Sequence, residues 1–159
     1  MRIFGIDPGT IVTGYGLIEK EKSRYAGIDF GEIKTKKDQV LSRRLEDIYN
    51  RLFEILQDVR PEAIALEDIF YGKNVKSLIK QGHVRGIIIL AASHAGIPVF
   101  EYSPLEVKKA VVGYGMADKA QVQQMVKAIL NLAKIPPPDA ADALAMALCH
   151  GNFMKKVSI

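Results

Sequence analysis

Residues 2–19 read RIFGIDPGTIVTGYGLIE and predict a β-hairpin. The segment from Arg2 to Ile6 is apolar and β-prone, and it runs into the turn-forming residues 7–9, Asp-Pro-Gly. Residues 14–19 then alternate in the manner of a half-exposed strand. The connection between the two strands contains a proline and a glycine, which favours a hairpin. A third strand is expected within residues 24–34, so the chain opens with an antiparallel meander.

The remainder of the chain alternates helices with short strands. Apolar residues recur at helical spacing between Val40 and Val59, which indicates an amphipathic helix. Residues 63–66 and 99–102 are short apolar runs and predict two more strands. Further helices are expected over residues 74–94, 103–113, 118–132 and 139–153. This order predicts an α/β fold: a five-stranded mixed sheet (three antiparallel strands, then β-α-β-α) with helices on both faces.

The length and composition are those of one ordinary globular domain. The chain has 159 residues, of which 48% are hydrophobic and 25% are charged, so disordered and fibrous classes are excluded. The longest apolar stretch, residues 86–92, is far shorter than the ~20 residues that span a bilayer. Cys149 is the sole cysteine, which excludes internal disulfides and four-cysteine zinc sites. We expect a single cytoplasmic domain over residues 1–159, with no membrane partner.

Four acidic residues occupy positions where a site can form. Asp7 and Glu67 each end an apolar strand, and ligand sites of α/β sheets gather at strand ends. Asp139 and Asp142 are three residues apart at an expected helix start, so they share one face of it. Four carboxylates brought together repel one another unless cations intervene. Because Mg²⁺ prefers oxygen ligands, this set is typical of a two-metal site.

Each of these acids also has a purely structural interpretation. Asp7 precedes Pro-Gly and could form a turn. Glu67 could be the first exposed residue after a buried strand. Asp139 is well suited to cap a helix, and Asp142 would then interact favourably with the helix dipole. Taken one at a time, the acids leave both interpretations open.

The charge balance is mildly basic, with 22 Lys and Arg against 18 Asp and Glu. This excess grows if metal ions neutralise several acids, and it then suits a polyanionic partner. The basic residues that we expect to contact nucleic acid are Lys73, Lys76, Lys80, Arg85, Lys108, Lys109 and Lys119. Phe70 and Tyr71 lie in a glycine-containing loop and could stack on unpaired bases. The alternatives are a solvated charged face and aromatic rings that anchor their own loop.

Three stretches of this sequence resemble, in order, the motifs of a known family. The first is GIDPGT at residues 5–10, continued by TGYG at 13–16; the others are ALEDIF at 65–70 and DAADALA at 139–145. They are similar to the opening, second and last motifs of the RuvC family of Holliday-junction resolvases. The similarity covers essentially the whole chain. Some members of that family carry His at the position of Asp139, whereas this chain has Asp.

The resemblance implies an RNase H-like fold and a homodimer that works beside RuvA and RuvB. It also implies nicking of two opposed strands of a four-way DNA junction in recombination and repair, with two Mg²⁺ ions per active site and Mn²⁺ as a substitute. The residues that match the family's catalytic, metal-binding acids are Asp7, Glu67, Asp139 and Asp142. Phe70 matches an aromatic residue implicated in base stacking, and the residues that match basic positions near the scissile phosphate are Lys108 and Lys119.

A dimer can also be argued from symmetry. A four-way junction has approximate two-fold symmetry, and one short domain offers one site, so two equivalent cuts favour a C₂ dimer. Gly82 and Gly86 lie four residues apart on the expected helix over residues 74–94 and would allow another helix to approach closely. Packing of these glycines within the monomer is an equally good interpretation.

Three other functions deserve comparison. An actin-like ATPase also opens with an Asp-x-Gly-Thr motif, but it needs two such domains, for which 159 residues are too few. An RNase H-like nuclease that acts on RNA would use the same acids. A catalytically silent junction-binding protein would not need all four of them. His83, His94 and His150 have no metal-ligand spacing and are not expected to take part.

Overall fold

The computed structural model describes residues 1–69 and 74–154. Its strands are β1 (Arg2–Asp7), β2 (Val12–Glu21), β3 (Arg24–Lys34), β4 (Ala63–Glu67) and β5 (Val99–Tyr102). Its helices are α1 (Leu41–Val59), α2 (Val75–Ala95), α3 (Pro104–Val112), α4 (Lys119–Ile129) and α5 (Pro138–Phe153). The expected order of elements is confirmed. The largest boundary differences are at β2, which is longer at both ends than expected, and at α4, which ends three residues early.

The five strands form one mixed sheet in the order β3-β2-β1-β4-β5. β1, β2 and β3 pair antiparallel and make the predicted meander, while β4 pairs parallel with both β1 and β5. Because β1 and β4 are parallel neighbours with Ile6 opposite Leu66, they end side by side at the same edge of the sheet. The residues that follow, Asp7 and Glu67, therefore start close together.

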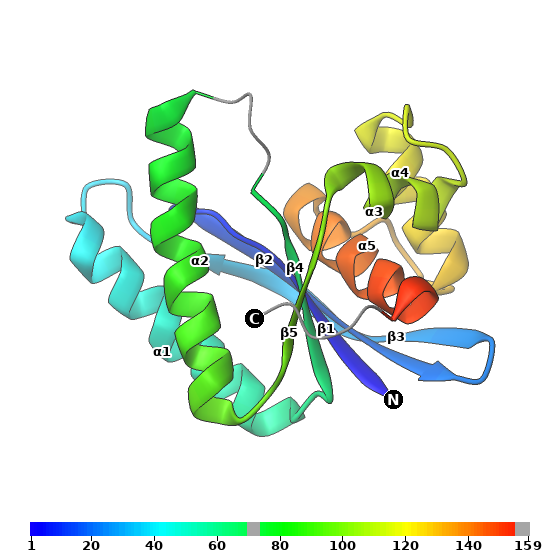
Figure 1. Ribbon diagram of the computed structural model, residues 1–159, viewed down its shortest axis with the longest axis horizontal. Coiled ribbons are helices and arrows are strands. Elements are labelled where there is room, and N and C mark those ends of the chain that lie inside the picture. Colours follow the sequence, from blue (N-terminus) through cyan, green and yellow to red (C-terminus); the bar gives the residue numbers. More distant parts are fainter. Residues whose placement is uncertain (70–73, 155–159) are drawn as a thin grey trace.

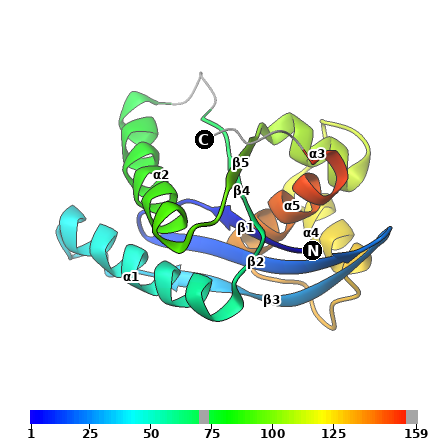
Figure 2. The ribbon, with the colours of Figure 1, turned by 60° about the horizontal axis from the view of Figure 1, so that its bottom comes forward.

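Helices cover both faces of the sheet, as predicted: α1 and α2 on one face, and α3, α4 and α5 on the other (Figure 1). Figure 2 shows the same layers with the sheet between the two groups of helices. The division follows the two-residue period of a strand, since Ile3 packs toward α5 and Phe4 toward α1 and α2. No helix in the described part of the chain is long and apolar enough to cross a membrane.

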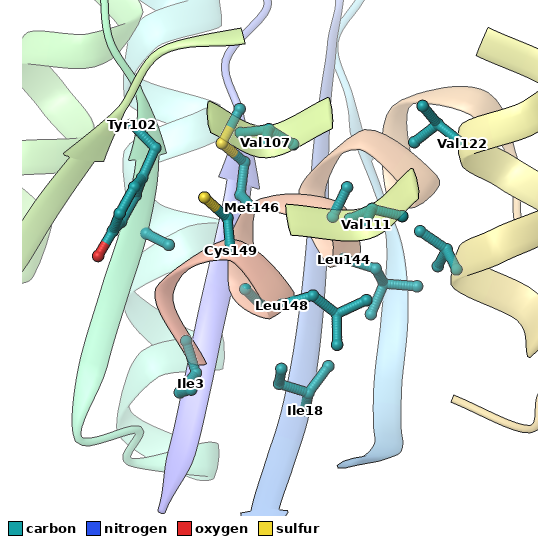
Figure 3. Packing of buried hydrophobic residues seen from close by; sticks show 14 of the residues in the cluster. Ile3, Ile18, Tyr102, Val107, Val111, Val122, Leu144, Met146, Leu148 and Cys149 are labelled. Atoms are coloured by element: carbon teal, nitrogen blue, oxygen red, sulfur yellow. The ribbon is translucent and has the colours of Figure 1, made fainter. Parts of the chain in front are cut away.

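Helix α5 lies directly on β1 and β2 because glycines remove the side chains between them. A methyl group built at Gly5 would overlap the backbone carbonyl of Ala143, and one built at Gly14 would overlap that of Asp139. The facing side of α5 is made of alanines and of Leu144, which is fully buried against Gly16 (Figure 3). The glycines of the first sequence motif thus set how near the start of α5 comes to the end of β1.

The helices begin in two different ways, with a side-chain cap or without one. Ser103 and Asp118 form capping boxes with Glu106 and Gln121, so both predicted starts are confirmed. Helix α5 differs, because Pro138 is its first residue and no side chain caps it. Asp139 lies inside the first turn and cannot be the N-cap, which removes one of its structural interpretations.

Candidate active site

Four acidic side chains from three elements line a single pocket of about 630 Å³. Asp7 is the last residue of β1 and Glu67 is the last residue of β4, two adjacent parallel strands. Asp139 and Asp142 project from the first two turns of α5, which the glycines of β1 and β2 hold against the sheet. The residues that the sequence grouped by strand-end and helix-face rules are therefore brought together by the fold.

The turn after Asp7 is held by a buried threonine. The hydroxyl of Thr13 donates a hydrogen bond to the carbonyl of Gly9 at 2.7 Å, and its oxygen accepts one from the Gly9 amide at 3.4 Å. The Thr13 side chain is fully buried. This closed turn fixes the direction in which the chain leaves β1, and with it the position of Asp7 at the pocket wall.

The acids are close enough to change one another's protonation. Burial, together with the negative charges of Asp142, Glu67 and Asp139, raises the pKa of Asp7 from 3.8 to about 7, although the positive charge of Lys119 opposes this shift. Burial also raises the pKa of Asp142, again against the influence of Lys119. Adding negative charge to this pocket is therefore unfavourable, and a bound cation would relieve the repulsion.

Carboxylate oxygens are the ligands that hard divalent cations prefer, so the donor set fits such an ion. Within residues 1–69 and 74–154, no three acidic, histidine or cysteine side chains are near enough to form a closed cage by themselves. One of the four acids instead interacts with a lysine: Lys119 Nζ lies 3.4 Å from Asp142 Oδ2. The four acids thus line the pocket as candidate oxygen ligands.

The comparisons with known proteins place the chain in one family. The family model of crossover junction endodeoxyribonuclease RuvC matches residues 3–150. This protein belongs to the RuvC family. A RuvC of Ruminiclostridium cellulolyticum is 52% identical over 96% of this chain and 92% of its own length. Metal-dependent catalysis is typical of this family of nucleases.

Solved structures agree with the family and the fold. Thermus thermophilus RuvC in complex with a Holliday junction substrate has a TM-score of 0.91 and 36% identity, covering 97% of this chain and 94% of its own. The yeast mitochondrial Holliday junction resolvase Ydc2 has a TM-score of 0.65 at 13% identity, covering 92% and 76% of the two chains, and shows the fold alone. The predicted RNase H-like architecture is confirmed.

In this RuvC-family chain, three of the predicted basic residues surround the acidic pocket. Lys80 of α2, Lys108 of α3 and Lys119 of α4 all line it. Lys119 has a raised pKa because the negative charge of Asp142 stabilises its ammonium group. Lys76 and Lys109 are exposed on α2 and α3 and are not among the residues that line this pocket. Phe70, Tyr71 and Lys73 lie outside the described residues.

Arg85 differs from the sequence prediction. Only 6% of this residue is exposed, so its guanidinium group is not available to a phosphate. It pairs with the carboxylate of Glu101 on β5 and donates a hydrogen bond to the backbone carbonyl of Glu67. The physical reason is the orientation of α2, which turns Arg85 toward the sheet rather than toward the pocket opening.

Among the pocket residues that the sequence analysis did not assign to the site are two polar residues of α2, Ser77 and Gln81. Lys80 and Gln81 follow Ser77 at spacings of three and four residues, which places both of them next to Ser77 on the helix surface. That spacing was a signal in the sequence, although neither residue belongs to a recognised motif. Both side chains offer neutral hydrogen-bond donors beside the lysine.

Proposed function

We propose that this protein is a metal-dependent endonuclease that resolves Holliday junctions by paired, symmetric cuts in two opposed strands, in recombination and DNA repair. The observation that carries the proposal is the convergence of four acids, one with a strongly raised pKa, in a pocket bordered by three lysines. Membership of the RuvC family supports the junction as substrate. The proposal assigns the nuclease activity to one domain, residues 1–159, acting in the cytoplasm.

The four acids are proposed as the ligands of two Mg²⁺ ions, with Mn²⁺ as a substitute. The ligands are Asp7, Glu67, Asp139 and Asp142, and Asp7 has the central position, between the end of β4 and the start of α5. These residues would hold ions that, when bound, would activate a water molecule and stabilise the leaving 3′ oxygen. Asp7 must lose its proton to bind a cation, so metal binding and deprotonation of this residue are coupled.

The lysines supply the phosphate contacts. Lys80, Lys108 and Lys119 line the pocket from three different helices, which suits a phosphodiester backbone held across its opening. Lys76 and Lys109 extend this basic surface outward. Phe70, Tyr71 and Lys73 follow Glu67 closely in the sequence. We propose that the rings of Phe70 and Tyr71 stack on bases unpaired at the junction and that Lys73 contacts a phosphate.

The protein is proposed to act as a homodimer through the outer face of α2. Apart from the adjacent residues and the nearby backbone of α2 itself, no heavy atom of the described residues lies within 4 Å of a Cβ built at Gly82 or Gly86, so these glycines are not packing positions within the monomer. Ile79 and Leu90 are about half exposed on the same helical stripe, at spacings of three and four residues from the glycines. Two such stripes could pack closely across a two-fold axis. RuvA and RuvB are proposed as further partners.

The test is cleavage of a synthetic mobile four-way junction beside a linear duplex of the same sequence. Each DNA is incubated with Mg²⁺, with chelator, and with the Asp7→Asn variant in place of the wild type. Paired nicks in the junction alone, lost with chelator and with the variant, support the proposal. Equal cutting of both DNAs would replace it with a less selective nuclease. Binding without cutting would mean a silent junction-binding protein.

A further inference from the structure

A buried arginine sits behind the metal-binding end of β4. Arg85 lies in the middle of α2 and is 6% exposed. One amino group of its guanidinium donates to the backbone carbonyl of Glu67, and the other donates to the carboxylate of Glu101. These two partners are on adjacent parallel strands, because Leu66 stands opposite Glu101 in the β4–β5 register. Arg85 therefore joins α2 to both strands at once.

Burial of the Arg85 guanidinium group costs free energy, and its hydrogen bonds to Glu67 and Glu101 are rigid once formed. A guanidinium group cannot lose its charge in a protein, so it must keep a carboxylate and hydrogen-bond acceptors when it leaves water. Its planar, forked geometry then fixes the relative position of the two acceptors. One acceptor here is the main chain of Glu67 itself. Movement of that carbonyl is opposed by the pair with Glu101.

Glu67 needs such support because it is at the end of a short strand. β4 has five residues, and the amide of Asp68, which donates to the carbonyl of Tyr102 at 2.9 Å, extends its pairing with β5 by one residue. The side chain of Tyr102 is hydrogen-bonded to His150 Nδ1 at 2.8 Å, so β5 is also tied to α5. The strand that anchors Arg85 is thus connected to the helix that carries Asp139 and Asp142.

We infer that Arg85, held by Glu101, is a positioning residue that fixes the end of β4 so that the carboxylate of Glu67 faces the metal site. The inference rests on the proposed function of Glu67 as a metal ligand. It replaces the role in DNA contact that the sequence suggested for Arg85. Outer residues that orient a metal ligand typically change metal affinity or activity by about 10–100-fold when removed.

The test compares Mn²⁺ affinity and junction affinity in the same variants. Arg85→Met removes both hydrogen bonds, Glu101→Gln weakens the anchor, and Arg85→Lys keeps the charge but not the fork. Arg51→Met is the matched control, since it removes a positive charge from an exposed ion pair with Glu54 on α1. Calorimetry gives the Mn²⁺ affinity without DNA, and fluorescence anisotropy gives junction affinity in chelator.

For Arg85→Met we expect Mn²⁺ affinity to fall by roughly 10–100-fold while junction affinity stays within about twofold of wild type. Arg85→Lys should lie between wild type and Arg85→Met, and Arg51→Met should match wild type. If Arg85→Met does not fold, Glu101→Gln decides: weaker Mn²⁺ binding in a folded Glu101→Gln protein supports the inference.

Two results would overturn it. Weaker junction binding with a smaller salt dependence and unchanged Mn²⁺ affinity would make Arg85 a phosphate contact. Unchanged Mn²⁺ and junction affinities in every folded variant would leave the pair a purely structural one. Glu67→Gln separates this failure from that of the proposed function: if Glu67→Gln itself leaves Mn²⁺ affinity unchanged, the metal site was assigned wrongly, and both ideas fall.

Discussion

The carboxyl group of Asp7 is surrounded by features that oppose its ionisation. It is largely buried, and three other acids line the same pocket, which together raise its pKa to about 7. The folded protein therefore binds a proton at this residue over a pH range in which the unfolded chain, with a pKa of 3.8, does not. Stability from this group is complete below about pH 3.8 and is lost as the pH rises toward 7.

Asp7→Asn should accordingly stabilise the metal-free protein. At about pH 8 in chelator, we expect the free energy of unfolding to rise by roughly 1–4 kcal/mol, because the variant no longer has to ionise a buried carboxyl group. The same variant should lose junction cleavage by roughly 10²–10³-fold or more. Urea denaturation at about pH 8 and pH 5 measures the first effect. A gain that does not shrink at the lower pH would contradict the explanation.

The acids of the site could be predicted from the sequence, whereas Arg85 could not. Asp7 and Glu67 end apolar strands, so a rule about strand ends predicts that they lie at the edge of the sheet, where the parallel neighbours β1 and β4 bring them side by side. Arg85 precedes an almost continuous apolar run, residues 86–92, in which every helical face looks equally hydrophobic. Its burial depends on which side of α2 meets the sheet, and the hydrophobic periodicity of this segment does not indicate that side.

Helix α5 packs directly on β1 and β2 because glycines of these strands leave no side chains between the helix and the sheet. Gly14→Ala should destabilise the fold by about 1–3 kcal/mol, because its methyl group would overlap the Asp139 carbonyl, and the backbone there has little freedom to move. Cleavage should fall as well, since α5 carries two of the acids. Thermal denaturation and junction cleavage measure the two effects.

Gly31→Ala is the matched control for this substitution. Gly31 pairs with Tyr15 on the neighbouring strand, and a methyl group there would meet the end of the Tyr15 ring, which can move. We expect a smaller loss of stability and unchanged cleavage. If both alanine variants behave alike, the close approach of α5 to β2 does not control the site.

The stability contributed by His150, which joins α5 to Tyr102 of β5, should depend on pH. Burial lowers the pKa of His150 from its ordinary value of 6.5, and the positive charge of Lys20 lowers it further. The unfolded chain therefore binds a proton at this residue before the folded protein does. The stability that His150 contributes is complete above pH 6.5 and is lost as the pH falls below that value.

Comparison with His150→Gln isolates this effect. Wild type should lose more free energy of unfolding than the variant when the pH is lowered from about 7.5 to about 5.5, because glutamine does not titrate. The difference between the two proteins cancels the opposite contribution of Asp7, which both retain. Parallel curves for the two proteins would show that His150 is not titrating in this range.

Some helix starts are determined by nearby residues in the sequence, and others by contacts between distant segments. The starts of α3 and α4 were predictable because a capping box is formed by two residues only three positions apart in the sequence, as in Ser103 with Glu106. The position of Asp139 inside the first turn of α5 was not predictable, because the helix starts at Pro138 without a side-chain cap and is held instead by its packing on the sheet. Contacts between distant segments decided that case.

For the whole molecule, the outer face of α2 tests the proposed dimer. Gly86→Arg adds a long charged side chain at a position where no described atom outside the nearby backbone of α2 and the adjacent residues lies within 4 Å of a built Cβ, so the monomer should fold normally. At a helix–helix interface the same side chain would prevent close approach, and we expect the dimer to dissociate at least about 100-fold more readily, a change of about 3 kcal/mol. Sedimentation equilibrium measures the change.

The consequence for cleavage follows from symmetry. A dimer holds two sites at fixed separation, so the second cut occurs before the junction can dissociate. With Gly86→Arg the two cuts should become independent, and a supercoiled plasmid bearing an extruded cruciform should accumulate singly nicked circles rather than linear products. Ser42→Arg, an exposed position on α1, should behave as wild type. Linear products at the wild-type rate from a monomeric Gly86→Arg protein would mean that pairing of the cuts has another origin.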